Sequence, residues 1–163
     1  MHVGILPSQV HSLNYTVPLE QAAVEYESAL GGALGDGDPK ANGEPPVLDA
    51  VVLGMGPDGH TASLFPGHPL VDEVDRWVAP IMDSPKPPAD RITFTLPVLN
   101  AARLALFVVT GEKKADAVQR AFAPEPDVPA GHVLAKQRTH WLIDSPAAAM
   151  LVADEAKQDH MYG

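Results

Sequence analysis

The sequence predicts an α/β protein built on a parallel β-sheet, and two features lead to this prediction. Two short apolar segments, Val47–Leu53 (VLDAVVL) and Leu104–Thr110 (LALFVVT), are rich in β-branched residues, as is typical of strands buried in a parallel sheet. Segments with helical features alternate with such strands, which favours this fold class. The chain has 163 residues, 45% of them hydrophobic and 20% charged, so we expect residues 1–163 to form a single domain.

The first half of the chain contains a helix and three strands by these criteria. Pro18–Leu34 predicts a helix, because alanine, tyrosine and leucine recur at helical spacing and Pro18 suits a first turn. A loop rich in glycine and proline precedes the strand at Val47–Leu53. Trp77–Met82 and Arg91–Leu96 (RITFTL) predict two further strands, joined by the loop SPKPPAD.

The second half predicts further alternation of helices and strands. The expected elements are one or two helical turns at Pro97–Ala102, the strand Leu104–Thr110, a helix from Gly111 to about Phe122, a strand at His140–Ile143 and a helix at Ala147–Ala156. The triplet Asp144-Ser145-Pro146 is a helix-start signal for the last of these.

Composition narrows the class of protein. The formal net charge of −10 makes a broad nucleic-acid-binding surface or an anionic-membrane surface unexpected. No apolar run is long enough to span a bilayer, and the first eleven residues lack the features of a signal peptide. Cysteine is absent, which excludes disulfides and thiolate chemistry and fits a cytoplasmic protein.

The segment GMGPDGHTASLFPG, residues 54–67, matches two phosphate-binding patterns only in part. Gly54, Gly56 and Gly59 spell G-x-G-x-x-G, but Pro66 stops any following helix after about two turns, too early for a dinucleotide fold. The same segment resembles a P-loop with His60 in place of lysine, and histidine carries no permanent charge near neutral pH. Neither nucleotide interpretation is well supported.

What remains is a strand end followed by a glycine turn, with Asp58 and His60 at the start of a short helix. Ligands bind at this carboxyl end in open parallel sheets. The positive end of a helix would keep His60 neutral and able to act as a base. The alternative is that His60 caps the helix and Asp58 only stabilises the turn.

This loop resembles the signature segment of the 6-phosphogluconolactonase family. The similarity continues in DRITFTLPVLNAARLALFVVTGEKKADAV and in HWLIDSPAA, so it covers nearly the whole chain. The resemblance implies a Rossmann-like α/β sandwich related to the sugar-phosphate isomerases. It also implies hydrolysis of 6-phosphogluconolactone to 6-phosphogluconate in the oxidative pentose phosphate pathway, without a metal or cofactor. The loop histidine, here His60, is implied to be the general base.

The residues present suit this chemistry. Lactone hydrolysis needs an activated water, a stabilised oxyanion and an anchored substrate. Neutral His60 can accept the proton of water, and Asp58 either orients His60 or contacts a sugar hydroxyl. Backbone N–H groups around Gly56 to Gly59 are candidates for the oxyanion, which makes Gly54, Gly56 and Gly59 candidate substrate-binding residues.

The substrate's phosphate requires cations, and the resemblance points to Arg91 and Lys114 for this role. A lysine at a helix start adds its charge to free backbone N–H groups. The neighbouring Lys113 is interpreted as a surface charge. No H-E-x-x-H pair is present, so a zinc site is not indicated, and Ser63 lacks the G-x-S-x-G setting of a nucleophile.

Two alternatives belong to other functional classes. Glucosamine-6-phosphate deaminases have a similar Asp-Gly-His loop, but in that family a glutamate stands at the position of Phe65. A non-catalytic sugar-phosphate sensor would be expected to carry a DNA-binding segment, for which the sequence has no pattern.

The sequence also departs from the lactonase pattern near its start. The family's N-terminal glycine-rich phosphate loop and its Asp-Glu-Arg motif do not occur here. The sequence therefore predicts that the chain corresponds to the C-terminal part of such an enzyme and lacks its N-terminal strands.

Overall fold

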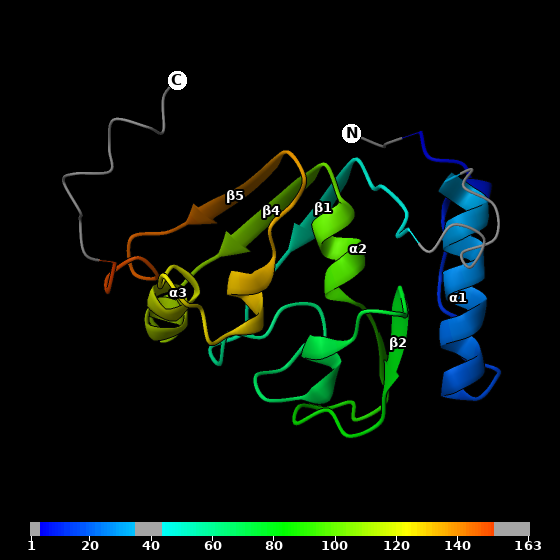
Figure 1. The fold of residues 1–163 in the computed structure, drawn as a ribbon, viewed down its shortest axis with the longest axis horizontal. Helices are drawn as coiled ribbons and strands as arrows, with labels where there is room; N and C mark the ends of the chain where they lie inside the picture. The colour runs from blue at the N-terminus through cyan, green and yellow to red at the C-terminus, as the bar shows by residue number, and fades with distance from the viewer. Residues whose placement is uncertain (1–3, 35–43, 152–163) are drawn as a thin grey trace.

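The computed structural model describes residues 4–34 and 44–151, and it has the predicted α/β architecture. Three strands, β1 (Ala50–Leu53), β4 (Leu104–Val109) and β5 (Arg138–Ile143), form a parallel sheet in the order β1-β4-β5 (Figure 1). The register pairs Val51 with Ala105 and Phe107 with Trp141. All three strands were predicted, although β1 begins three residues later and β5 two residues earlier than the sequence indicates.

A second unit of the fold is an antiparallel ribbon of β2 (Val78–Ile81) and β3 (Arg91–Phe94). It packs against helix α1 (Leu19–Leu34), which lies beside β2 in Figure 1. The Glu27 carboxylate of α1 accepts hydrogen bonds from the backbone N–H groups of Trp77 and Val78 at 2.8 and 2.9 Å. These bonds join the helix to the first strand of the ribbon.

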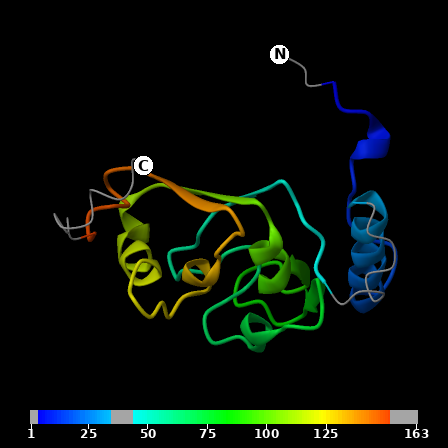
Figure 2. The ribbon, with the colours of Figure 1, turned by 45° about the horizontal axis from the view of Figure 1, so that its top comes forward.

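The helices of the second half lie on one side of the parallel sheet. Figure 2 shows α2 (Leu96–Ala101), α3 (Ala115–Ala121) and the 3-10 turn Pro129–His132 on the same side of the strands. The main hydrophobic cluster forms between these elements and the sheet. Its fully buried members include Leu64, Leu99, Phe107, Val118 and Val128.

The opposite face of the sheet is exposed in the part of the chain that the structure describes. Val52, Val108 and Leu142 are 72%, 47% and 58% exposed. The sequence predicted Val47–Leu53 and Leu104–Thr110 as buried strands, and the exposure of Val52 and Val108 corrects this for one face. Alternate side chains of a strand point to opposite faces, and the described elements cover only one of them.

Two predicted helices are corrected by the structure. No helix begins at His60, because Gly59 has φ 84° and Ala62 has φ 48°, left-handed values that a right-handed helix does not contain. After β5, residues 145–150 form turns, and the remainder of the predicted helix at Ala147–Ala156 extends beyond the described residues. The Asp144 carboxylate still accepts from the N–H of Ala147 at 2.9 Å, as a helix-capping aspartate does.

The other predicted helices are present. Two of them, Leu19–Leu34 and Leu96–Ala101, match the expected ranges. The helix predicted from Gly111 to about Phe122 is present as a 3-10 turn at Glu112–Lys114 followed directly by α3. The described helices include none that is long and apolar enough to cross a membrane. The assignment of residues 1–163 to a single domain stays a prediction, because it includes residues outside the described ranges.

Candidate active site

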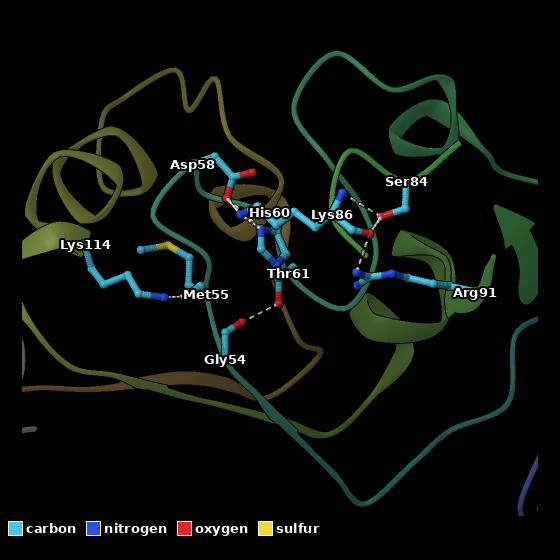
Figure 3. A network of polar contacts seen from close by, with 9 residues as sticks. All are labelled: Gly54, Met55, Asp58, His60, Thr61, Ser84, Lys86, Arg91 and Lys114. Carbon is cyan, nitrogen blue, oxygen red and sulfur yellow. Dashed lines mark hydrogen bonds and ion pairs between the residues drawn. The ribbon is translucent and has the colours of Figure 1, made fainter. Parts of the chain in front are cut away.

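The candidate site lies at the carboxyl ends of β1 and β4, which are neighbours in the sheet. β1 ends at Leu53 and leads directly into the glycine loop, residues 54–67. β4 ends at Val109 and is followed by the turn that carries Lys114. The Lys114 ammonium donates a hydrogen bond to the carbonyl of Met55, so the two segments meet across the strand ends (Figure 3).

Asp58 and His60 form a close pair within the loop. The Nδ1 atom of His60 lies 2.6 Å from Oδ1 of Asp58, and the His60 side chain is 18% exposed. An ionised carboxylate can only accept hydrogen bonds, so Nδ1 carries the proton of this contact. The lone pair of the imidazole is then on Nε2, which has no hydrogen-bond partner among the described residues. A neutral histidine held in this way can accept a proton at Nε2.

The Asp58 carboxyl remains ionised far below neutral pH. Burial acts to raise its pKa, but hydrogen bonds from Lys86 and His60 outweigh that effect and lower the pKa to about 2. Asp58 is therefore a carboxylate over the whole neutral range. This agrees with the expectation that Asp58 orients His60, although the contact does not test a role toward substrate.

We expect Asp58 to contribute to stability in a pH-dependent way. Its pKa in the folded protein lies below the ordinary 3.8, so the ionised group stabilises the fold above about pH 4, and this contribution is lost as the pH falls toward 2. Asp58→Asn should lower the free energy of unfolding near pH 7 by less than about 1 kcal/mol, because the side chain is 36% exposed and screened by solvent. Denaturant unfolding of both proteins between about pH 2 and 7 measures the difference, and a difference that grows as the pH falls would contradict the assignment.

Gly56 makes the close approach of the pair to the backbone possible. A Cβ atom at this position would lie 2.0 Å from Nδ1 of His60 and 2.4 Å from Oδ1 of Asp58. Any side chain would therefore displace both groups. Gly56 is needed at this position for space rather than for an unusual backbone conformation.

The other two predicted glycines have different surroundings. Gly59 has φ 84°, and a Cβ there would lie 2.5 Å from the side chain of buried Val128, so conformation and packing both require glycine. A Cβ at Gly54 would meet nothing within 4 Å. The Gly54 carbonyl accepts a 2.9 Å hydrogen bond from the hydroxyl of Thr61, which is completely buried and closes the loop.

Two of the predicted oxyanion donors, the N–H groups of Gly56 and Gly59, are already engaged within the loop. The N–H of Gly56 donates to the carbonyl of His60 at 2.9 Å, and that of Gly59 donates to the carbonyl of Gly56 at 3.0 Å. Pro57 has no N–H. The N–H groups of Gly56 and Gly59 are therefore not free to bind an oxyanion in this conformation, and a role for the loop N–H groups stays a prediction.

Lys86 is a site residue that was not predicted. Its ammonium donates to Oδ1 of Asp58 at 2.8 Å and lies 3.1 Å from Nδ1 of His60 (Figure 3). It belongs to the loop SPKPPAD between β2 and β3. The only local signal is a lysine held between prolines, which stiffen the backbone but do not say where the side chain points.

Lys114 faces the same space as His60. Both residues line a hollow of about 430 Å³ at the glycine loop, together with Gly54, Met55, Gly56, Pro57 and Ala62. Burial lowers the pKa of the Lys114 ammonium, the positive charge of Lys86 lowers it further, and Asp58 acts in the opposite direction. The ammonium groups of Lys86 and Lys114 are close enough to repel each other, and together they make this region positively charged in a protein whose net charge is negative.

Arg91 is placed differently from Lys114. It lines a second hollow, of about 530 Å³, with residues of the N-terminal segment and of the ribbon. Its Nε and Nη2 atoms donate to the carbonyls of Lys86, Pro87 and Pro88 at 2.7–2.9 Å. The guanidinium lies 5.6 Å from the ring centroid of Phe65. Its role toward phosphate stays a prediction.

Phe65 completes the surroundings of the imidazole. Its ring is buried, and the ring centroids of Phe65 and His60 are 4.7 Å apart. This is the position at which a deaminase would carry a glutamate. The described residues contain no cluster of three or more histidine and carboxylate side chains that could hold a metal ion.

The fold and the site together define a parallel-sheet α/β protein with an Asp–His pair and lysines at the carboxyl end of the sheet. The chain belongs to the family of glucosamine-6-phosphate isomerases and 6-phosphogluconolactonases, whose sequence model matches residues 1–141. Over 147 residues it is 47% identical to human 6-phosphogluconolactonase, and the match covers 88% of this chain and 55% of the human protein. It is 43% identical to chloroplastic 6-phosphogluconolactonase 3 of Arabidopsis thaliana, with 91% of this chain and 47% of that protein covered.

Solved structures agree with the family assignment. The fold is similar to 6-phosphogluconolactonase from Thermotoga maritima, with a TM-score of 0.72 and 29% identity over 85% of this chain and 57% of that one. It is similar to the enzyme from Trypanosoma cruzi with a TM-score of 0.71 and 30% identity, covering 82% of this chain and 53% of that one. The chain thus spans about half the length of the curated relatives it matches.

Proposed function

We propose that this chain carries the acid–base site of a 6-phosphogluconolactonase, which hydrolyses 6-phospho-D-glucono-1,5-lactone to 6-phospho-D-gluconate. The observation that carries the proposal is the Asp58–His60 pair beside a hollow that His60 and Lys114 line, with Nε2 of His60 not engaged by Asp58. The names of the human and Thermotoga relatives support the same reaction. Its place is the oxidative pentose phosphate pathway.

The chemistry requires one base and one bound water. His60 Nε2 removes a proton from the water as its oxygen attacks the lactone carbonyl carbon, and Asp58 stabilises the imidazolium that forms. When the ring C–O bond breaks, the imidazolium returns the proton to the departing ring oxygen. The products are the open-chain carboxylate and one released proton, so the step needs no metal or cofactor.

The main competing activity is deamination of glucosamine 6-phosphate. A monomeric glucosamine-6-phosphate deaminase shares the fold with a TM-score of 0.64, but it is only 22% identical. The phenyl ring of Phe65 beside His60 cannot do the acid–base work of a carboxylate, which favours lactone hydrolysis.

The two activities and a purely binding role are separated by a direct assay of the full-length protein. We expect acceleration of lactone hydrolysis above its spontaneous rate and no release of ammonia from glucosamine 6-phosphate. Ammonia release would favour the deaminase. Binding of 6-phosphogluconate without turnover of the lactone would favour a sugar-phosphate sensor. Cytoplasmic localisation stays a prediction, since the Arabidopsis relative is named as chloroplastic.

We further propose that Lys114 and Arg91 anchor the substrate's phosphate. Lys114→Ala should weaken binding of 6-phosphogluconate roughly ten- to a hundredfold, the equivalent of about 1.5–3 kcal/mol for a charge-assisted contact, and leave binding of gluconate unchanged. Arg91→Ala should likewise weaken binding of 6-phosphogluconate and leave binding of gluconate unchanged. Calorimetric titration with the two ligands measures both effects.

Lys113→Ala is the matched control, because this exposed lysine is adjacent in sequence. It should bind both ligands as the parent does. An Arg91→Ala variant that loses affinity for both ligands equally would show that Arg91 only holds its loop. A Lys114→Ala variant with unchanged preference would remove Lys114 from the phosphate site.

A further inference from the structure

Lys86 is the one cation that directly contacts the Asp58–His60 pair among the described residues. Its Nζ atom lies 2.8 Å from Oδ1 of Asp58 and 3.1 Å from Nδ1 of His60. The same carboxylate oxygen therefore serves two partners, which come from segments 26 residues apart in the sequence. Figure 3 shows the three side chains converging on this point.

The backbone around Lys86 is held from several directions. Its carbonyl accepts hydrogen bonds from Arg91 Nη2 at 2.7 Å and from the hydroxyl of Ser84 at 2.8 Å. Arg91 Nε and Nη2 also donate to the carbonyls of Pro88 and Pro87 at 2.9 and 2.8 Å. The loop is thus tied to β3 through one guanidinium. A lysine on so constrained a backbone is suited to hold one position rather than sample solvent.

The geometry determines what the ammonium does to the imidazole. Because Nδ1 donates to the Asp58 carboxylate, it cannot also accept from Lys86, whose ammonium has donors only. The 3.1 Å approach therefore places a cation beside an N–H. A second proton on Nε2 would convert the ring to an imidazolium next to this ammonium, which electrostatic repulsion opposes.

The other charged groups around His60 either favour or oppose a second proton on its ring. Asp58 attracts a proton to the ring. Lys114, from the β4–α3 connection, lines the same hollow and opposes protonation, and Arg91, beyond the Phe65 ring, has the same sign. Lys86 is the nearest of the three cations, since it directly touches both members of the pair.

We propose that Lys86 is a positioning residue for His60, which orients the shared Asp58 carboxylate and keeps the imidazole neutral with Nε2 open. The consequence for catalysis rests on the proposed lactonase function. The effect on the proton state of His60 does not, because it follows from the three side chains alone.

Lys86→Met, which keeps the length of the side chain and removes its charge, tests the proposal. Loss of the cation favours the imidazolium, so the acid limb of the pH–kcat/KM profile should move to higher pH. Lys86→Arg should return the limb toward the parent position. Lys113→Met, which removes an exposed lysine, should leave it unchanged.

A substrate-free measurement separates this proposal from the lactonase function. NMR titration of the His60 ring should show its protonation moving to higher pH in Lys86→Met, and Lys86→Gln provides a second uncharged variant if the first does not fold. Unchanged His60 protonation, or a lower plateau rate with an unmoved acid limb, would overturn the role of Lys86 while leaving lactone hydrolysis standing. A moved titration in a protein without lactonase activity would overturn the function and retain the role of Lys86.

Discussion

His60→Ala is expected to reduce lactone turnover by roughly 10²–10⁴-fold, the usual scale for loss of a general base. The variant removes the only group of the Asp58–His60 pair that can accept a proton from water, because the Asp58 carboxyl has a pKa of about 2 and is too weak a base. The fold should remain, since the His60 side chain lines a hollow rather than the main hydrophobic cluster. Initial rates of lactone opening in the full-length protein measure the effect, after subtraction of spontaneous hydrolysis.

His68 offers a closely matched control. Its Nε2 atom lies 3.0 Å from Oδ1 of Asp83, and its side chain is 17% exposed, so it resembles His60 in burial and in having an aspartate partner. It does not line the hollow that His60 and Lys114 share. His68→Ala should therefore keep the parent turnover. If His60→Ala also stays within a few-fold of the parent, His60 is not the base.

Gly56→Ala should cost at least about a hundredfold in turnover without changing a single reactive group. Its new Cβ would lie 2.0 Å from Nδ1 of His60 and 2.4 Å from Oδ1 of Asp58, whereas ordinary contacts begin near 3.4 Å. The pair must therefore shift by about 1 Å or more, and a misplacement of this size can reduce the rate about a hundredfold. Turnover, together with the His60 ring signals in NMR spectra, measures the loss and the displacement.

Gly54→Ala is the control, because it makes the same chemical change two residues earlier in the loop. A Cβ at Gly54 meets nothing within 4 Å, and neither Gly54 nor Gly56 has a left-handed φ. Gly54→Ala should therefore leave Asp58 and His60 in their parent positions, which unchanged His60 ring signals in NMR spectra would show. Equal changes of the His60 ring signals in the two variants would show that the loop tolerates no added Cβ at either position, and that the Gly56 effect is not specific to the pair.

The elements that the sequence predicted well are those with strong local patterns. Helix α1 has regular apolar spacing, and β4 is a continuous β-branched run, and the structure places both within two residues of the expected ends. The helix expected at His60 had only a start signal and a proline stop. It is replaced by a turn because the positive φ of Gly59 and Ala62 and the Thr61–Gly54 hydrogen bond close the loop instead.

Within the site, proximity in sequence separates what could be predicted from what could not. Asp58 and His60 are two residues apart, so one turn brings them together, and the motif alone indicated their chemistry. Lys86 could not be predicted, because its contact depends on how the β2–β3 loop crosses the glycine loop. The sequence also did not predict that the Gly56 and Gly59 N–H groups form hydrogen bonds within the loop. These bonds depend on φ and ψ values that the glycine pattern does not determine.

By itself, the sequence determined the class of fold, the position of the loop at a strand end and the family to which the chain belongs. These properties depend on local hydrophobic period and on a long contiguous motif, which act over short stretches of chain. Only the tertiary structure decided that Lys86 shares the Asp58 carboxylate, that Arg91 bonds to three loop carbonyls and that one face of the sheet is exposed among the described residues. Such contacts join residues far apart in sequence, and their existence depends on how whole elements pack rather than on the preferences of any one segment.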